Sequence, residues 1–527
     1  MSPELIHARR WWILPVLCLS VFLVVVDNTI VNVALPTLSR ELGADTSQLQ
    51  WIVDAYALVF ASLLLAMGSL GDRFGRKGTM QLGLVLFAIT SVAAGISQTA
   101  GQLIAARALM GVGAALVFPA TLAILINVFT DPTERAKAIG VWSAVTGLAV
   151  ALGPVSGGWL LEHFWWGSVF FVNLPIVAIA LLLGQVLIPT SKDPDAGRLD
   201  PVGLLLSIAA ITLLVWTVIE APKMGWASAT TIGSFVLSGV LLAAFVQWER
   251  RRRDPMLDVT VFRNPRFTAA SVSVMIAFFS LFGFIFLITQ YFQFVRGYST
   301  LSAGLHTLPF AFAAGVTAPI AARLALRFGS KRIVTLGLLS MSAGFLVAST
   351  NGLDTPFWGP VVLGMVLIGS GLTLTTAPAT DAIMGSLPKE KAGVGSAVND
   401  TTRELGGTLG VAVVGSVFSS IFGPRLVDAL RDLPVPASAL DAARESMAAA
   451  LAVAEQAPAS AQPVIIDAAR RAFVDGMHVG SRVAAVAALF GAVLAYRFLP
   501  ARSSTHGAIL DNDAVGAIDE AVTAETA

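Results

Sequence analysis

Charged side chains interrupt the long apolar stretches of this sequence, and these residues have the most potential for chemistry. Asp27 lies near the middle of the apolar run of residues 11–36, which is long enough to cross a bilayer. A charged Asp at the centre of a membrane helix costs about 2.5–3.5 kcal/mol, so the first interpretation is a functional one. The alternative is that Asp27 lies at a helix end. We therefore take Asp27 as the first candidate site for a proton or a cation.

Arg107 lies inside another apolar run, where an unpaired charge is costly and an acidic partner is required. Asp27 and Asp54 are the nearest candidates, because each lies about 9–14 Å from the same boundary of the membrane by helical rise. The sequence leaves the choice between these two acids open.

Two further acids, Asp400 and Glu404, are four residues apart and therefore share one helical face. Glu404 lies about 18 Å from the start of its span, near the middle of the membrane. Arg403 could neutralise Asp400, which is the structural alternative for that acid. Apolar surroundings favour the protonated form of a carboxyl group, whereas an entering cation favours the ionised form. Competition for one such site is sufficient to couple proton entry to cation export.

The composition excludes several classes of protein. The 527 residues are 56% hydrophobic and 13% charged, with a mean hydropathy of +0.78, which excludes an ordinary soluble protein. A net charge of +1 gives no basic field for nucleic acid, and the single Cys18 allows neither an intrachain disulfide nor a cysteine metal site. The five histidines form no catalytic grouping, and the phosphate-binding motif G-x-x-x-x-G-K-[ST] does not occur. We expect a membrane protein that is not an enzyme, with no cofactor and no metal.

The apolar runs predict fourteen transmembrane spans and hence an all-α membrane protein. Residues 11–36 are expected to be a retained first span rather than a cleaved signal. Basic residues concentrate in the connections after even-numbered spans, which places both termini in the cytoplasm. The spans cover residues 11–36, 48–70, 79–97, 101–126, 137–161, 166–188, 199–220, 229–248, 267–295, 300–326, 332–350, 357–386, 392–422 and 477–499.

One internal repeat predicts how these spans are grouped. The stretch GDRFGRKGTMQLGLVLF at residues 71–87 recurs as LRFGSKRIVTLGLLSMS at residues 326–342, with Leu326 in place of Asp72. Two related halves would place these loops after spans 2 and 10 and leave spans 7 and 8 as an insertion, a 6+2+6 plan. The expected parts are a first bundle (1–190), two inserted helices (191–262), a second bundle (263–500) with an external loop (423–476) that holds an amphipathic helix (441–456), and a disordered cytoplasmic tail (501–527).

The stretch GSLGDRFGRKG at residues 68–78 resembles the signature loop of the major facilitator superfamily. The resemblance implies the major facilitator fold and a gating role for the loop residues Gly68, Asp72, Arg73, Gly75 and Arg76. By itself, the loop predicts a tight turn at its glycines, with Asp72 facing a helix N-terminus and the basic side chains in water.

Other motifs narrow the resemblance. LIAARALMGVGAAL at 103–116, which contains Arg107, resembles the fourth-helix motif, and GLAVALGPVSGG at 147–158 resembles the fifth-helix motif of antiporters. The glycines of the latter would let another helix seal against it, and its proline would bend it. Its expected gating residues are Gly147, Gly153, Pro154, Gly157 and Gly158. Two motifs, VDNTIVNVALPTL (26–38) and WIVDAYAL (51–58), resemble those of the fourteen-helix drug:proton antiporters. Two others, HFWWGSVFFVNLPI (163–176) and AVNDTTRELGG (397–407), resemble the sixth and thirteenth helices of the quaternary ammonium exporters in that family.

The resemblance implies a monomeric proton-coupled antiporter of the cytoplasmic membrane that exports lipophilic cationic drugs, dyes or antiseptics by alternating access. Its partners would be these cations, protons and membrane lipids. We favour Asp27 with Arg107 for proton coupling and Asp400 with Glu404 for substrate charge, and Asp54 could serve either role. The alternative is a dedicated exporter of one endogenous molecule, such as a natural product, a siderophore or a lipid.

Overall fold

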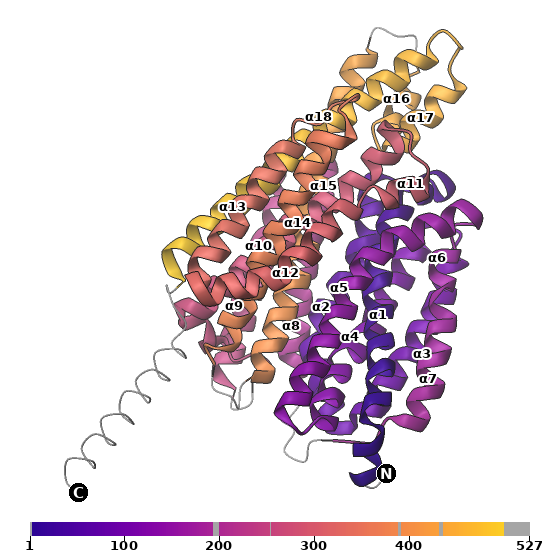
Figure 1. The fold of residues 1–527 in the computed structure, drawn as a ribbon. Coiled ribbons are helices and arrows are strands. Elements are labelled where there is room, and N and C mark those ends of the chain that lie inside the picture. The colour runs from indigo at the N-terminus through magenta and orange to yellow at the C-terminus, as the bar shows by residue number, and fades with distance from the viewer. Residues whose placement is uncertain (1–2, 193–199, 253–254, 388–391, 432–435, 500–527) are drawn as a thin grey trace, which may run out of the picture.

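The protein is a bundle of long helices joined by short connections (Figure 1). A computed structural model describes residues 3–192, 200–252, 255–387, 392–431 and 436–499. Fourteen helices in these residues are long and apolar enough to cross a membrane. A helix satisfies its backbone hydrogen bonds internally, which is a requirement for a single segment in lipid. The prediction of an all-α membrane protein with fourteen spans is confirmed.

The first six spans contain the predicted proton-coupling residues. Asp27 lies in α1, Asp54 in α2 and Arg107 in α4. The sixth span is divided at Val172, which leaves Asn173 as the first residue of α7. These spans are α1 (Pro3–Leu42), α2 (Thr46–Phe74), α3 (Arg76–Gly95), α4 (Ala100–Val128), α5 (Pro132–His163) and the pair α6 (Ser168–Phe171) and α7 (Asn173–Leu187).

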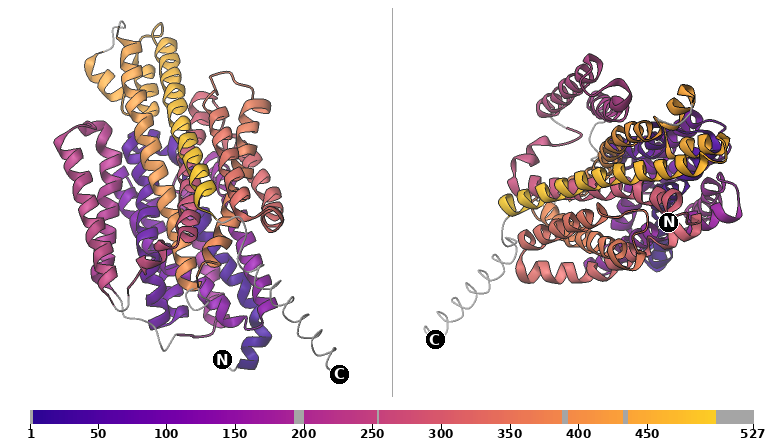
Figure 2. Two further views of the ribbon diagram at one scale, coloured as in Figure 1. Left: turned by 90° about the vertical axis from the view of Figure 1, so that its left-hand side faces the viewer. Right: turned by 90° about the horizontal axis from the view of Figure 1, so that it is seen from above.

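The seventh and eighth spans, α8 (Pro201–Met224) and α9 (Ala229–Arg251), form a hairpin at the edge of the bundle (Figure 2). Only α8 makes extensive contact with the other spans, and it packs against α2 and α15. Leu58, Val218 and Ala412 belong to the small apolar cluster at this junction. The 6+2+6 grouping of the spans stays a prediction.

The last six spans are less regular than the first six. A π-helical turn ends the ninth span, and a kink at Trp358 and Gly359 opens the twelfth. The remaining elements are η1 (Val259–Arg263), α10 (Pro265–Gln290), η2 (Tyr291–Val295), α11 (Thr300–Leu305), α12 (Leu308–Phe328), α13 (Ser330–Ala348), η3 (Phe357–Val361), α14 (Val362–Met384), α15 (Ala392–Leu430), α16 (Ala437–Ala443), α17 (Met447–Gln456) and α18 (Gln462–Phe498).

The predicted external loop of residues 423–476 is more helical than expected. Helix α15 continues to Leu430 and α18 already begins at Gln462, so both spans project beyond the rest of the bundle (Figure 1). The amphipathic helix predicted at residues 441–456 is divided into α16 and α17, because the Ser446 side chain caps a new helix there. We call this end of the molecule the α16–α17 end. The predicted tail, residues 501–527, lies outside the described residues.

The internal repeat seen in the sequence corresponds to a repeated backbone turn. Gly75 separates α2 from α3 with a φ of 116°, and Gly329 separates α12 from α13 with a φ of 86°. Both values lie in the region that glycine adopts without a steric penalty. The shared R-F-G sequence therefore has a local cause, since one glycine allows two long helices to follow each other directly.

Candidate functional site

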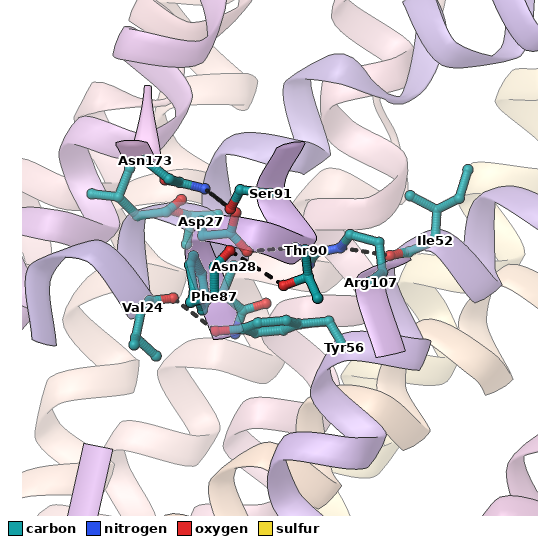
Figure 3. A network of polar contacts seen from close by, with 12 residues as sticks. Val24, Asp27, Asn28, Ile52, Tyr56, Phe87, Thr90, Ser91, Arg107 and Asn173 are labelled. Carbon is teal, nitrogen blue, oxygen red and sulfur yellow. Dashed lines mark hydrogen bonds and ion pairs between the residues drawn. The ribbon is translucent and has the colours of Figure 1, made fainter. Parts of the chain in front are cut away.

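An ion pair between Asp27 and Arg107 lies in the interior of the first six spans (Figure 3). Both side chains are fully buried, and Arg107 Nη1 donates a hydrogen bond to Asp27 Oδ2. Of the two acids that the sequence offered to Arg107, the structure therefore brings Asp27 to it. Breaking a buried pair by removing one partner costs about 3–5 kcal/mol, because the other charge stays buried without compensation.

Helix α2 holds the guanidinium group of Arg107 from the other side. Arg107 Nε donates to the carbonyl oxygen of Ile52 at 3.1 Å, and Arg107 Cζ lies 4.3 Å from the centre of the Tyr56 ring. The Tyr56 hydroxyl donates to the carbonyl oxygen of Val24 at 3.1 Å and so connects α2 back to α1. Tyr56 was not among the residues predicted from the sequence, although it lies within the WIVDAYAL motif.

Asn173 holds the second oxygen of the Asp27 carboxylate. Asn173 Nδ2 donates to Asp27 Oδ1 at 2.9 Å and to the hydroxyl oxygen of Ser91 at 3.2 Å (Figure 3). All three side chains are buried. Asn173 was also missed as an individual residue, and its position inside the HFWWGSVFFVNLPI motif was the available signal.

Asp54 lies on a different face of α2. A separation of two residues turns a helix by about 200°, so Asp54 points away from both Ile52 and Tyr56. Its neighbours one helical turn away contact α15, because Gln50 Nε2 donates to the carbonyl oxygen of Ala412 at 2.9 Å and Leu58 packs in the same apolar cluster as Ala412. Asp54 is fully buried, and neither carboxylate oxygen has a hydrogen-bond partner among the described residues.

The two acids of α15 are partly exposed. Arg403 Nη1 lies 3.8 Å from Asp400 Oδ1, and the guanidinium carbon of Arg403 lies 4.7 Å from the centre of the Phe278 ring on α10. Glu404 is close enough to act electrostatically on the Tyr56 hydroxyl. Within the described residues, neither acid forms a hydrogen bond or ion pair with Asp27.

The signature loop is almost entirely helical. Asp72 Oδ1 accepts a hydrogen bond from Arg76 Nε at 2.7 Å across the Gly75 turn, and Lys77 Nζ donates to the carbonyl oxygen of Gln185. Arg73 lies over the ring of Phe74, at 5.7 Å from its centre. The expectation that all the basic side chains remain in water is wrong for Arg76, since the one-residue turn brings it to Asp72.

The Gly68 side of the loop makes a looser contact. A Cβ on Gly68 would lie 3.7 Å from Pro119 Cβ on α4, which is ordinary van der Waals separation. In this structure, the space around Gly68 would also accommodate a residue with a Cβ atom.

Glycines of α5 allow close contacts with two other helices. Gly153 lies against Thr29 and Gly157 against Ile30, both on α1, where an added Cβ would overlap these residues. Gly158 lies against the backbone of Thr300. Gly147 differs, because a Cβ at that position would meet no atom within 4 Å among the described residues. Pro154 contacts Gly304 of α11 through its carbonyl group.

Hydrogen bonds join the first six to the last six spans at the α16–α17 end. Three of them use side-chain donors and backbone acceptors, so they depend on close approach of the helices. They are Thr289 Oγ1 to the Asn32 oxygen (2.9 Å), Gln293 Nε2 to the Val33 oxygen (2.9 Å), Gln50 Nε2 to the Ala412 oxygen (2.9 Å) and Thr46 N to the Glu445 oxygen (3.1 Å). The bundle is closed at this end.

Asp45 connects this closed end to helix α8. Its carboxylate caps α2 by accepting from Gln48 N, and Lys223 Nζ of α8 lies 2.8 Å from Asp45 Oδ2. Partial burial works to raise the pKa of Asp45, but the hydrogen bonds from Lys223, Gln48 and Ser47 outweigh it, so this pKa lies below its usual value.

An apolar hollow of about 460 Å³ lies between α1 and α5. Its lining offers aromatic and aliphatic surface but no acid, so it cannot by itself recognise a charge. The lining residues are Trp11, Leu14, Pro15, Cys18, Leu19, Phe22, Val141 and Val145.

Comparisons with known proteins agree on one family. The family model described as Major Facilitator Superfamily matches residues 17–411. The chain is 37% identical to the multidrug efflux pump LfrA of Mycolicibacterium smegmatis, covering 92% of this chain and 95% of that protein. It is 38% identical to the methyl viologen resistance protein SmvA of Salmonella typhimurium, covering 88% and 93%. The inward-facing, unoccupied structure of a bacterial homologue of the lysosomal transporter Spinster has a TM-score of 0.65 at 17% identity, covering 94% of this chain and 98% of that one.

Proposed function

Because this chain belongs to the major facilitator superfamily of transporters, we propose that it exports lipophilic cations from the cell in exchange for protons. It is a multi-pass membrane transporter and not an enzyme. Its similarity to a multidrug efflux pump and to a methyl viologen resistance protein supports a drug exporter. Methyl viologen is itself an organic dication, so this relative favours cations as the substrate class for this chain as well.

The observation that carries the proton coupling is the buried Asp27–Arg107 pair. A carboxylate that shares its charge with one buried arginine is stable in the ionised form, and protonation removes the attraction between the two helices. The pair therefore has two states, held together or released, that differ by one proton. Because α1 and α4 carry these residues, release of the pair would change the packing of the first six spans.

We assign Asp54 to proton coupling rather than to substrate binding. Its side chain is fully buried between α2 and α15 and has no hydrogen-bond partner among the described residues, so a bulky cation has no access to it in this state. A buried carboxylate without a partner is costly, whereas the neutral acid is tolerated more easily. Closing the α16–α17 end would then require Asp54 to hold a proton.

We assign the binding of the substrate's positive charge to Asp400 and Glu404. These acids are partly exposed on α15, and Phe278 lies nearby on α10 to offer an aromatic face. Arg403 also occupies this region, at 3.8 Å from Asp400, so a cation would have to displace or outcompete it there. Glu404 is the freer of the two acids for a monovalent cation.

Export further requires that the closed end opens. We propose that the glycine face of α5, with Pro154, seals against α1 and α11 in one state and separates from α11 in the other. The Asp72–Arg76 turn would be the corresponding element of the opposite end. We also propose that both termini are cytoplasmic, that the α16–α17 end is external, and that the transporter acts as a monomer.

One experiment tests this function directly. Cells that express the chain are loaded with a panel of organic cations, such as the lipophilic monocation tetraphenylphosphonium and the dication methyl viologen, and efflux is followed with and without a protonophore. Proton-coupled export predicts efflux of several panel members that stops when the proton gradient collapses. Efflux of none of them would reject the proposal and favour a dedicated exporter of one endogenous molecule.

A further inference from the structure

We propose that Asn173 positions the Asp27 carboxylate and supports it in both its ionised and its protonated state. This inference rests on the proposed role of Asp27 in proton coupling. It concerns a residue of the sixth span that would act only through Asp27.

The two oxygens of Asp27 are held by donors of different kinds from different helices. Arg107 of α4 donates to Oδ2, and Asn173 of α7 donates to Oδ1 at 2.9 Å (Figure 3). The ion pair alone would leave Oδ1 buried without a partner, at the cost of an unsatisfied polar group. Asn173 therefore completes the hydrogen bonding of the ionised carboxylate and fixes the rotation of its plane.

The amide of Asn173 is oriented by a second contact. Its Nδ2 carries two hydrogens, and the second is donated to the Ser91 hydroxyl oxygen at 3.2 Å. With both hydrogens used, Asn173 Oδ1 faces no donor among the described residues, although the side chain is 1% exposed. A buried acceptor with no partner is unusual in a folded protein and calls for an explanation.

Protonation of Asp27 provides that explanation. A protonated carboxyl group has a hydroxyl that must donate, and an amide nitrogen cannot accept it. A half-turn of the amide would bring the idle Oδ1 of Asn173 to face the Asp27 hydroxyl. The Ser91 hydroxyl can either accept or donate, so it can keep a hydrogen bond to Asn173 after the amide has turned. Asparagine allows this exchange of roles, because its amide presents a donor on one side and an acceptor on the other.

The surroundings of Asp27 contain few other groups that could produce the same effect. Arg107 of α4 and the Tyr56 hydroxyl of α2 are the titratable groups that face it, and Glu404 of α15 acts on Tyr56 from further away. The neighbouring parts of α3 and α7 contribute the uncharged side chains of Ser91 and Asn173. A change of pH dependence after replacement of Asn173 would therefore report on its bond to Asp27.

The test is the pH dependence of transport by the full-length protein in proteoliposomes, with tetraphenylphosphonium as the probe. Asn173→Ala removes one hydrogen bond from each form of Asp27, and the bond to the ionised carboxylate is the stronger of the two, so the proton is held more tightly in the variant. We expect the midpoint of the pH profile to rise by about one unit. Ser91→Ala leaves the contact with Asp27 but loosens the amide, and should move the midpoint in the same direction by less. Asn173→Gln keeps the amide and should restore the parental profile in part.

Controls separate this inference from the function on which it rests. Asn351→Ala removes another buried asparagine, far from Asp27 in sequence and in the connection after α13, and should leave the midpoint unchanged. A parental midpoint in both Asn173→Ala and Ser91→Ala, with Asp27→Asn inactive, would overturn the role of Asn173 alone. Normal proton-coupled exchange by Asp27→Asn would instead reject the coupling role of Asp27. If Asn173→Ala does not reach the membrane, the shift expected for Ser91→Ala decides the question.

Discussion

Gly158 of α5 lies so close to Thr300 at the start of α11 that a Cβ on the glycine would be 2.5 Å from the Thr300 carbonyl oxygen. The Thr300 hydroxyl also donates to the Gly158 carbonyl oxygen at 3.0 Å. This contact joins the first six spans to the last six at the α16–α17 end. A methyl group at Gly158 is incompatible with this contact, because the atoms that it would meet, in Thr300 and Leu301, belong to the backbone and cannot rotate away.

The first prediction is that Gly158→Ala shifts the protein away from the closed arrangement. Overpacking costs about 1–3 kcal/mol, which corresponds to roughly a tenfold loss of the closed population. Spin labels at the exposed residues Glu41 and Thr350, on either side of this end, should report longer distances in the variant. Gly140→Ala is the matched control, since a Cβ there meets nothing within 4 Å among the described residues. Unchanged distances in Gly158→Ala would refute the seal.

Loss of the acid at Asp27 should abolish proton coupling and also lower the stability of the protein, and a second substitution should separate the two effects. Asp27→Asn leaves Arg107 buried without its counter-charge, so we expect lower stability, by about 3–5 kcal/mol, and no proton-driven efflux. The double variant Asp27→Asn/Arg107→Gln removes both charges and should recover much of the stability without recovering coupling. Thermal unfolding of the purified proteins and exchange in proteoliposomes measure the two effects. Proton exchange by Asp27→Asn in proteoliposomes would show that another acid carries the proton.

Loss of either acid of α15 should weaken the binding of divalent cations more than that of monovalent cations. A divalent cation can use both Asp400 and Glu404, whereas a monovalent cation needs one negative charge and an apolar surface. Asp400→Asn and Glu404→Gln should each weaken binding of a divalent probe about tenfold, or by about 1–2 kcal/mol, and affect a matched monovalent probe less. Equal losses for both probes in both variants would leave this assignment without support. If Asp400 only pairs with Arg403, its loss should instead lower expression.

The Asp45–Lys223 contact predicts that the stability of the protein depends on pH. The pKa of Asp45 lies below its usual value, so the contact contributes stability above about pH 4 and loses it as the pH falls through the lowered pKa. Lys223 is half exposed, so the contribution is small, about 0.5 kcal/mol. Lys223→Met should remove that part of the acid dependence of thermal unfolding. An identical acid dependence in Lys223→Met and the parent would show that the contact contributes nothing.

Membrane orientation is the last prediction. Basic residues after even-numbered spans predict that both termini lie in the cytoplasm and that the α16–α17 end lies outside. An alkaline phosphatase reporter fused after Leu499 should be inactive, because it folds only outside the cytoplasm, and one inserted near Pro436 should be active. A green fluorescent protein at the same two positions should give the opposite pattern. The reverse result in both assays would invert the topology.

Much of this protein can be predicted from the sequence, because membrane spans are set by local composition. Apolar length predicted the fourteen spans, the cost of a charge in lipid singled out Asp27, and the resemblance of residues 103–116 to a family motif singled out Arg107. The repeated R-F-G likewise predicted two similar turns, and the structure has positive-φ glycines at Gly75 and Gly329. Each of these inferences needs only the properties of one segment at a time.

Only the tertiary structure decided which side chains meet. Depth along a span left Arg107 with two possible partners, and the rotation of α2 turns Asp54 toward α15, away from Arg107. The same reason explains why Asn173 was not recognised, since an asparagine in an apolar span has no pattern until α7 is placed against α1. Helix packing also decides that Gly147 faces open space whereas Gly158 of the same helix faces α11. Helix rotation and packing depend on all the spans at once, and no single stretch of sequence encodes them.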